Sequence, residues 1–385
     1  MVPDAGNNYT GGPDRLPVYQ EKENDFMVRI SIRWCFAGMF IRLAVAVLLA
    51  ASCTKGESYF ASMPEVSSIP VEVDAFVEGS ATKGSGMLDD TSIRTKEYGV
   101  FAWWRQKEGY FDGVDDEHLY ADNYRATFVE MDGSVPLWKF SPSFWWPVGS
   151  TLSMFAYAPY MDCDGPVLVM PNGDSGPFPR GTYTVPSEVA SQADFCIAPM
   201  VYDRTPSMGN VSFVFNHALT RVHFSANVYD SEYVPGESDW VYRVESIMLS
   251  GLVGSNSFSV GKGSSGFKWD EVDQFDASVH TASYSVSFAG GLSSSYLPYS
   301  WDVEGLPVEE RYTLLNGAEG VTFYLLPQVI TNSAYVTFGL RPYRYSGGVW
   351  VDAGFSVPSF SARLTDGFDW VQGTTVSYVA TINVR

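Results

Sequence analysis

The sequence is short of the residues on which most metal sites and nucleophilic active sites depend. It has four cysteines and four histidines, and no two cysteines show the Cys-x-x-Cys spacing of a zinc or redox motif. Neither Gly-x-Ser-x-Gly nor His-Glu-x-x-His occurs, so common signatures of serine hydrolases and zinc proteases are missing. We therefore expect no catalytic residue, no cofactor and no metal ligand, and we predict that the protein is not an enzyme.

Positive charge is also scarce. The chain has 24 lysines and arginines against 44 aspartates and glutamates, a net charge of −20. Such an acidic surface repels the phosphates of nucleic acids and anionic lipids, and it favours solubility. The charge balance therefore argues against a nucleic-acid partner.

A hydrophobic run long enough to cross a membrane is missing as well. The apolar run Leu43–Ala51 has nine residues, whereas a membrane span needs about 20. Arg29 and Arg33 precede it, as in a secretory signal peptide. The small residues before Cys53 resemble a bacterial lipobox, which predicts lipidation of Cys53. An ordinary thiol after another kind of signal peptide is the alternative.

This interpretation sets the domain boundaries. Residues 1–26 are polar without periodicity and are expected to lie upstream of the true start, and residues 27–52 are the lipoprotein signal peptide. Residues 53–69 form a linker. The acidic stretch "YDSEYVPGESDW" at 229–240 contains Pro-Gly and separates two strand-rich halves. We therefore predict an N-terminal domain over 70–230 and a C-terminal domain over 240–385.

Strand patterns dominate both halves. In "VEVDAFVEG", alternate residues from Val71 to Val77 are apolar, which is typical of a half-buried strand. The segment "TTVSYVATINV" at 374–384 alternates in the same way. No window longer than about ten residues has a helical stripe. The pattern predicts an all-β fold of antiparallel sandwiches. The apolar face of the last segment consists of Val376, Tyr378, Ala380, Ile382 and Val384.

Several apparent sites have simpler interpretations. "GKGSSG" at 261–266 fits Gly-x-Gly-x-x-Gly, but no helical pattern follows, so a hairpin turn is favoured. The acidic stretch 112–122 is compatible with calcium but lacks the EF-hand order, so a solvated loop is favoured. His217 and His223 would lie about 20 Å apart on one continuous strand, too far to share a metal. Sequence does not decide whether Cys163 and Cys196 form a disulfide.

Tryptophan pairs offer a second line of interpretation. Trp103, Trp104, Trp145 and Trp146 could present flat faces to glycans. Adjacent residues on a strand point to opposite faces, so core packing of one ring in each pair is the simpler interpretation.

Together these segments resemble the fimbrillin-like proteins of Bacteroidetes, of the minor-fimbria type. The resemblance rests on their order along the chain. The segments are "IPVEVDAFVEGSATKG", "EYGVFAWW", "WKFSPSFWWPVGSTLSMFAYAPY", "QADFCIAP", "VSFVFNHALTRVHF", "YLLPQ" and the final Trp370-x-x-Gly373-x-x-x-x-Tyr378.

The resemblance implies two transthyretin-like antiparallel β-sandwich domains in tandem, without catalysis. It implies a structural or accessory subunit of a surface fimbria (pilus) that supports cell adhesion and is exported to the outer membrane as a lipoprotein. Its partners would be other fimbrial subunits, in a homo- or heteropolymer, and a host or bacterial surface ligand. The alternative is a surface glycan-binding lipoprotein, which would share the export signal and the sandwiches.

In the family, a trypsin-like protease removes the first strand, and the groove accepts a strand from the next subunit. Many members have Thr-Arg-Ala after that strand, whereas this chain has Lys83 in "SATKGS" and Arg94 further on. Both are candidate processing sites. The segment 374–384 is either the last strand of its own domain or the donor strand for a neighbour.

Overall fold

The structure is a computed structural model. It describes residues 64–78, 87–106, 118–133, 135–170, 179–229, 240–261, 266–288, 313–314, 322–346, 349–364 and 368–384. Within these ranges the regular elements are strands and three short 3-10 helices, so the predicted all-β fold is confirmed. Among the described residues, no helix is long and apolar enough to span a membrane. The 3-10 helices are η1 (Ser92–Thr95), η2 (Val189–Ser191) and η3 (Pro206–Met208).

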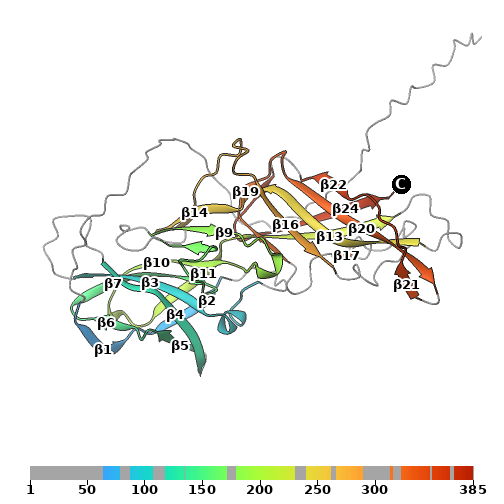
Figure 1. Ribbon diagram of the computed structural model, residues 1–385. Coiled ribbons are helices and arrows are strands. Elements are labelled where there is room, and N and C mark those ends of the chain that lie inside the picture. Colours follow the sequence, from blue (N-terminus) through green and yellow to red (C-terminus); the bar gives the residue numbers. More distant parts are fainter. Residues whose placement is uncertain are drawn as a thin grey trace, which may run out of the picture.

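A seven-stranded sheet forms one end of the elongated molecule (Figure 1). All neighbouring pairs in it are antiparallel except the pair at one edge, β2 with β11, which is parallel. In sheet order the strands are β2 (Val73–Val77), β11 (Val211–His217), β10 (Cys196–Arg204), β7 (Ser150–Ala158), β3 (Tyr98–Gln106), β4 (His118–Asp132) and β5 (Val135–Ser141).

This sheet curls on itself. Its two outermost strands, β2 and β5, also lie in contact with each other. A short antiparallel pair, β1 (Val66–Pro70) with β6 (Trp145–Pro147), lies beside it. The ring of Tyr98, from the middle of the sheet, meets the rings of Phe215 and Trp138 edge-on at 5.4 and 4.7 Å. The curl therefore closes one hydrophobic core around side chains from distant strands.

Two sheets make up most of the other end of the molecule. One has the order β17 (Thr313–Leu314), β12 (Thr220–Tyr229), β18 (Phe323–Leu325), with β24 (Thr375–Asn383) paired in parallel to β12. The second has the order β16 (Ala282–Ser287), β13 (Trp240–Leu252), β20 (Tyr335–Ser346), β21 (Val349–Asp352), with β22 (Phe360–Arg363) paired to β20. A further pair joins β19 (Gln328–Val329) and β23 (Asp369–Trp370).

A four-stranded antiparallel sheet contains strands from both halves of the chain. Its order is β15 (Phe267–Trp269), β14 (Ser255–Val260), β9 (Arg180–Thr184), β8 (Leu168–Val169). Strands β8 and β9 precede the predicted boundary at 230–240, and β14 and β15 follow it. Strands β14 and β15 form an antiparallel hairpin around "GKGSSG", closed by a hydrogen bond from Gly261 N–H to Gly266 O, which confirms the turn interpretation.

The central strands separate two hydrophobic cores. Along β3, Val100 and Ala102 face the core inside the curled sheet, whereas Phe101 and Trp103 face the larger core shared with the C-terminal sheets. This is the alternation that strand geometry imposes. One sheet thus serves as a wall for both cores.

One strand lies elsewhere than the sequence suggested. The predicted N-terminal domain over 70–230 includes β12, but β12 pairs with β17, β18 and β24 from the C-terminal part of the chain. Phe213 and Phe215 lie in the core inside the curled sheet, whereas Val222 and Phe224 belong to the larger core. From the domain boundaries at 70–230, one core would be expected to hold all four residues, and this expectation is wrong, because the chain changes sheets between β11 and β12.

Candidate functional site: the N-terminal strand and its anchors

Strand β2 occupies the edge of the seven-stranded sheet. It runs parallel to β11 over five residue pairs, from Val73 opposite Val211 to Val77 opposite Phe215. The alternate residues from Val71 to Val77 are only 4–6% exposed, whereas Phe76 on the other face is 43% exposed. The predicted alternation is therefore confirmed. The β-ladders of the described residues give β2 one partner strand, so its backbone is paired along one side.

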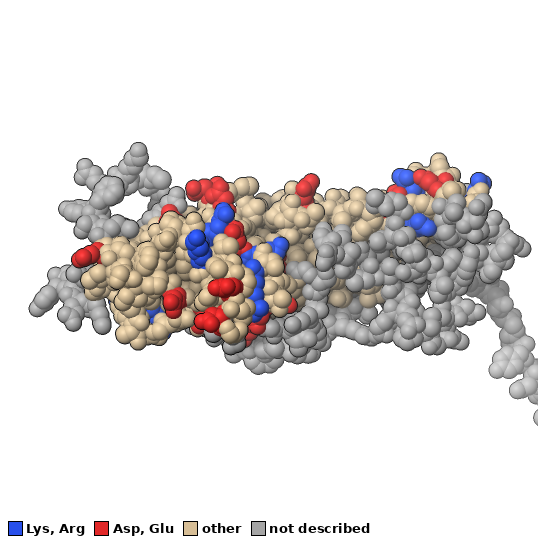
Figure 2. Space-filling model, turned by 90° about the horizontal axis from the view of Figure 1, so that it is seen from below, with Lys and Arg blue, Asp and Glu red and all other residues tan. Residues whose placement is uncertain are grey.

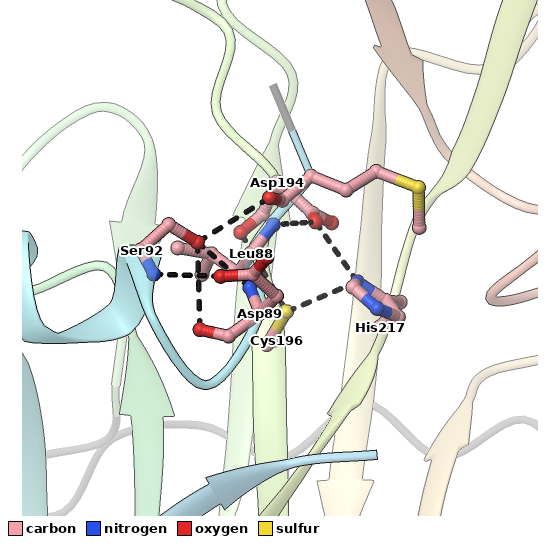
Figure 3. Close-up of polar contacts among 7 residues, drawn as sticks. Leu88, Asp89, Ser92, Asp194, Cys196 and His217 are labelled. Atoms are coloured by element: carbon pink, nitrogen blue, oxygen red, sulfur yellow. Dashed lines mark hydrogen bonds and ion pairs between the residues drawn. The ribbon is translucent and has the colours of Figure 1, made fainter. Parts of the chain in front are cut away.

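The chain is held on both sides of the segment that follows β2. At the end of β2, the Val77 N–H donates to Asp90 Oδ1 at 2.7 Å. Further along, the Leu88 N–H donates to Asp194 Oδ2 at 2.8 Å (Figure 3). Asp89 Oδ1 accepts from the Ser92 N–H at 2.7 Å and fixes the turn into η1. Strand β2 is paired with β11 and Leu88 is bound to Asp194, so each segment has its own tie to the sheet, and the hydrogen bond from Val77 to Asp90 links the two segments to each other. Residues 79–86, which connect them, lie outside the described residues.

Asp194 lies in a buried polar cluster with Cys196 and His217 (Figure 3). His217 Nδ1 donates to Asp194 Oδ2 at 2.8 Å, and Cys196 Sγ lies 3.4 Å from the same nitrogen. Burial lowers the pKa of His217, but the hydrogen bond to Asp194 and its negative charge outweigh burial, so the pKa is raised. The Asp194 carboxylate thus accepts hydrogen bonds from both His217 and Leu88.

This cluster is not arranged for nucleophilic catalysis. A relay needs the carboxylate on one ring nitrogen of the histidine and the nucleophile on the other, whereas both partners meet Nδ1 here. Burial, followed by the charge of Asp194, raises the pKa of Cys196 well above its ordinary value, so the sulfur stays a thiol. The cluster of Asp194, Cys196 and His217 also offers three possible metal ligand atoms within 4.8 Å of one another. However, the His217 ring and the Asp194 carboxylate already form a hydrogen bond with each other. The arrangement is suited to anchoring Leu88.

The candidate processing residues differ in their surroundings. Cys53 and Lys83 lie outside the described residues. Arg94 lies in η1, half-buried, where the Arg94 N–H donates to Thr91 O at 3.3 Å and the Lys96 N–H donates to Ile93 O at 3.1 Å. The Ile93 side chain is fully buried. A protease needs an extended segment, so cleavage at Arg94 requires this turn to open.

The C-terminal segment lies in its own sheet. β24 pairs with β12 over nine residues, and its inward side chains from Val376 to Ile382 are 1–5% exposed. Tyr378 stacks on Phe224 at 5.3 Å and accepts a hydrogen bond from Trp370 Nε1 at 2.8 Å. Val384 is half-buried at the end of the same face. This placement matches the first of the two predicted roles, and the donor role stays a prediction that requires β24 to leave its sheet.

The turn before β24 accounts for the spacing of the final motif. Gly373 has a φ of +69°, a conformation that favours glycine, and its N–H donates to Leu219 O at 3.0 Å. The turn returns the chain so that Trp370 and Tyr378 meet in the core.

Other sequence candidates are separated by the fold. His217 ends β11 and His223 lies within β12, so they are not on one strand. Cys163 and Cys196 are free and buried, so they do not form a disulfide. Trp146 is 3% exposed and Trp145 is 38% exposed, which agrees with one ring of that pair packing in the core.

Sequence reasoning missed the pairing of Asp194 with Leu88 and His217. Asp194 and His217 both lie in segments that carry the family resemblance, "QADFCIAP" and "VSFVFNHALTRVHF". That resemblance marked the two segments, but nothing in their spacing showed that they meet.

Comparisons with known proteins identify the family of the chain. The structure is similar to that of a fimbrial protein from Bacteroides vulgatus, with 17% identity, a TM-score of 0.54, and coverage of 81% of this chain and 95% of that chain. A protein from Bacteroides uniformis assigned to cell adhesion shows 15% identity, a TM-score of 0.39, and coverage of 82% and 93%. The comparison with curated proteins gives no match. Residues 89–385 match the fimbrillin-like family. Because this match spans more than half of the sequence, the chain belongs to the fimbrillin-like family.

Proposed function

We propose that the protein is a fimbrial subunit that is exported as a surface lipoprotein, assembles by strand exchange and supports cell adhesion. The observation that carries the proposal is the state of β2, a five-residue parallel strand at a sheet edge, while Leu88 further along the chain is held independently by Asp194. Family membership supports the same role. A subunit of this kind has no catalytic function.

Loss of β2 would open a groove suited to another strand. The apolar side chains of Val211, Phe213 and Phe215 would lose the cover of β2. The N–H and C=O groups of β11 that face β2 would lose their partners. An added strand satisfies such an edge through its backbone, and pockets for alternate side chains select its sequence. The groove would favour small or branched residues at every second position, as in β2 itself.

Within this proposal, processing occurs at Lys83 and not at Arg94. Lys83 lies in the sequence between β2 and Leu88, so a cut there separates β1 and β2 from the rest of the chain. The hydrogen bond from Leu88 to Asp194 stays in place, whereas departure of β2 breaks the hydrogen bond from Val77 to Asp90. A cut at Arg94 would break the hydrogen-bonded turn beside the buried Ile93. The protease would have to accept lysine, since an arginine-specific enzyme would leave this chain intact.

The outer-membrane location rests on Cys53. One acyl chain binds a membrane only marginally, so stable attachment requires the several chains of a bacterial lipoprotein. Cys53→Ala is expected to release the protein from membranes or to leave it unprocessed. Mass spectrometry that finds an unmodified mature N-terminus at another residue would contradict this part of the proposal.

Limited trypsin digestion tests the strand exchange. After cleavage, a fluorescent peptide with the sequence of residues 70–78 is expected to bind the protein, whereas uncut protein does not bind it. The matched variants Lys83→Gln and Arg94→Gln each remove one candidate site, and only Lys83→Gln is expected to prevent cleavage and binding. Cleaved protein that rejects the peptide would overturn the proposed exchange.

A deletion of residues 374–385 decides which strand fills the groove. If β24 is the donor, cleaved protein forms SDS-resistant ladders, and the deletion abolishes them while the monomer stays folded. If the deletion unfolds the monomer, β24 belongs to its own sandwich. The protein is then a tip or accessory subunit that accepts a strand and ends a fibre.

A further inference from the structure

A groove lies beside η1, on the end of the molecule formed by the seven-stranded sheet. It is separate from the groove that loss of β2 would open. Its volume is about 420 Å³, and its lining includes Arg94, Lys96, Glu97, Thr127, Phe128 and Tyr160. Small-molecule sites usually have about 300–1,000 Å³. η1 is the coiled ribbon on the lower side of the lobe in Figure 1. Figure 2 views the molecule from that side and shows Lys and Arg side chains gathered there among Asp and Glu.

The groove is locally basic in a chain of net charge −20. Glu97 is its one acidic lining residue, and it is already engaged. Its Oε2 lies 3.4 Å from Arg125 Nη1, and its Oε1 accepts from the Thr127 hydroxyl at 3.0 Å. Arg94 and Lys96 have no ion pair with any described residue, and the buried Arg94 Nε–H has no hydrogen-bond partner among them. Two cations therefore remain available to an anionic group.

Aromatic rings hold the guanidinium groups in place. The Arg94 guanidinium lies over the Phe128 ring, 6.0 Å from its centre, and the Arg125 guanidinium lies 4.3 Å from the centre of the Tyr160 ring. Cation–π contacts of this kind restrict a side chain that is otherwise flexible. Because less conformational freedom remains to be lost, binding of a carboxylate by Arg94 is less costly.

We propose that this groove binds an acidic saccharide whose carboxylate meets Arg94 and Lys96. The planar fork of an arginine matches a carboxylate. The parts of the Phe128 and Tyr160 rings that the guanidinium groups leave uncovered supply apolar contacts for the C–H groups of a sugar ring. The Thr127 hydroxyl, which donates to Glu97, can accept a hydrogen bond from a sugar hydroxyl. The groove has the size of a small-molecule site, which favours a short oligosaccharide over a protein surface. This site is independent of strand exchange.

Isothermal titration of the full chain with trigalacturonic acid tests the site. Arg94→Gln is expected to weaken binding at least tenfold, and Lys96→Gln about threefold. Lys268→Gln, which removes an exposed charge on the distant β15, is the matched control and is expected to leave binding unchanged. If Arg94→Gln impairs folding, the Lys96→Gln variant still tests the site, because the Lys96 side chain is exposed and its replacement does not disturb the core.

Two further ligands distinguish the source of the carboxylate. The methyl ester of trigalacturonic acid keeps the sugar and removes the charge, so it is expected to bind at least tenfold more weakly. A polyglutamate peptide is expected to bind weakly as well. Equal affinity for the ester, equal affinity for polyglutamate, or full binding by both groove variants would each overturn the proposal, and the polyglutamate result would indicate a protein partner instead.

Discussion

Strands β2 and β24 are each paired in parallel with a strand from the middle of the chain, yet they are held by different contacts. β2 shares five residue pairs with β11, and β24 shares nine with β12. The buried residues of β2 are two valines and an alanine, whereas β24 buries valine, tyrosine, alanine and isoleucine. Removal of β24 therefore exposes the larger apolar area. Because burial of a large apolar side chain contributes about 1.5–3 kcal/mol, removal of β24 also costs more free energy than removal of β2.

The side-chain contacts sharpen this difference. Tyr378 of β24 is both stacked on Phe224 and hydrogen-bonded to Trp370. On β2, Phe76 is 43% exposed and lies opposite Val214, which is 42% exposed. The comparison indicates that β2 is held by fewer and smaller contacts than β24, which is the difference that the proposed exchange of β2 requires. The following predictions test that division.

The largest effect is expected at Tyr378. Tyr378→Ala removes a fully buried ring and is expected to cost about 3–5 kcal/mol of unfolding free energy, measured by urea denaturation. Tyr378→Phe keeps the ring but leaves the Trp370 N–H without its acceptor, and it is expected to cost about 1–3 kcal/mol. Equal, small losses in both variants would show that β24 is held only loosely.

The pH response of His223 in β12 is expected to be the next largest. Burial and the neighbouring charge of Arg221 lower the pKa of His223 to about 4. The unfolded chain, with a pKa near 6.5, therefore binds this proton first, and stability is lost as pH falls from about 6.5 to about 4. The expected loss is about 3 kcal/mol, at 1.36 kcal/mol per pKa unit.

Denaturation of the wild type and of His223→Gln at several pH values between 7 and 4 measures this loss. The difference in unfolding free energy between the two proteins should change across that window. If the two proteins respond to pH in the same way, His223 does not carry the effect.

A matched pair of substitutions compares the two strands directly. Val73 and Val376 are each 5% exposed. Val73→Ala and Val376→Ala each remove two carbons and are expected to cost about 1–2 kcal/mol in the uncut protein. After trypsin cleavage and removal of β2, the effect of Val73→Ala should disappear while that of Val376→Ala remains. Persistence of the Val73 effect would show that β2 does not leave.

The sequence predicted what depends on local periodicity and missed what depends on distant pairing. Alternation identified the buried faces of β2 and β24, because neighbouring residues on a strand point to opposite sides. The parallel partners of these strands could not be predicted, since the partners lie more than 130 residues away in both cases. The switch of sheet between β11 and β12 was missed for the same reason, because both strands show the same local pattern.

The contacts of the candidate site around Asp194 also join residues that are far apart in the sequence, so they could not be predicted from local patterns. The resemblance marked the segments that contain Asp194 and His217, but the contact of Asp194 with Leu88 spans 106 residues. The groove beside η1 brings Arg94 next to Phe128 and Tyr160, which belong to separate strands or loops. Only the folded arrangement gives Arg94 a role other than that of a processing site.

The smallest effect is expected at His217, and its sign is opposite to that of His223. The pKa of His217 is raised because the hydrogen bond to Asp194 and its charge outweigh burial. Its contribution to stability is therefore fully present below the unfolded pKa of about 6.5 and is lost as pH rises through the folded pKa. The loss is limited because neutral His217 still donates its Nδ1–H to Asp194.

Unfolding free energies between pH 5.5 and 9 should show this decline in the wild type and not in His217→Gln. The protection factor of the Leu88 amide in hydrogen exchange, the intrinsic rate at each pH divided by the observed rate, should fall over the same range, because Asp194 anchors that amide. A decline that is identical in His217→Gln would assign the pH response to another group and leave the anchor insensitive to pH.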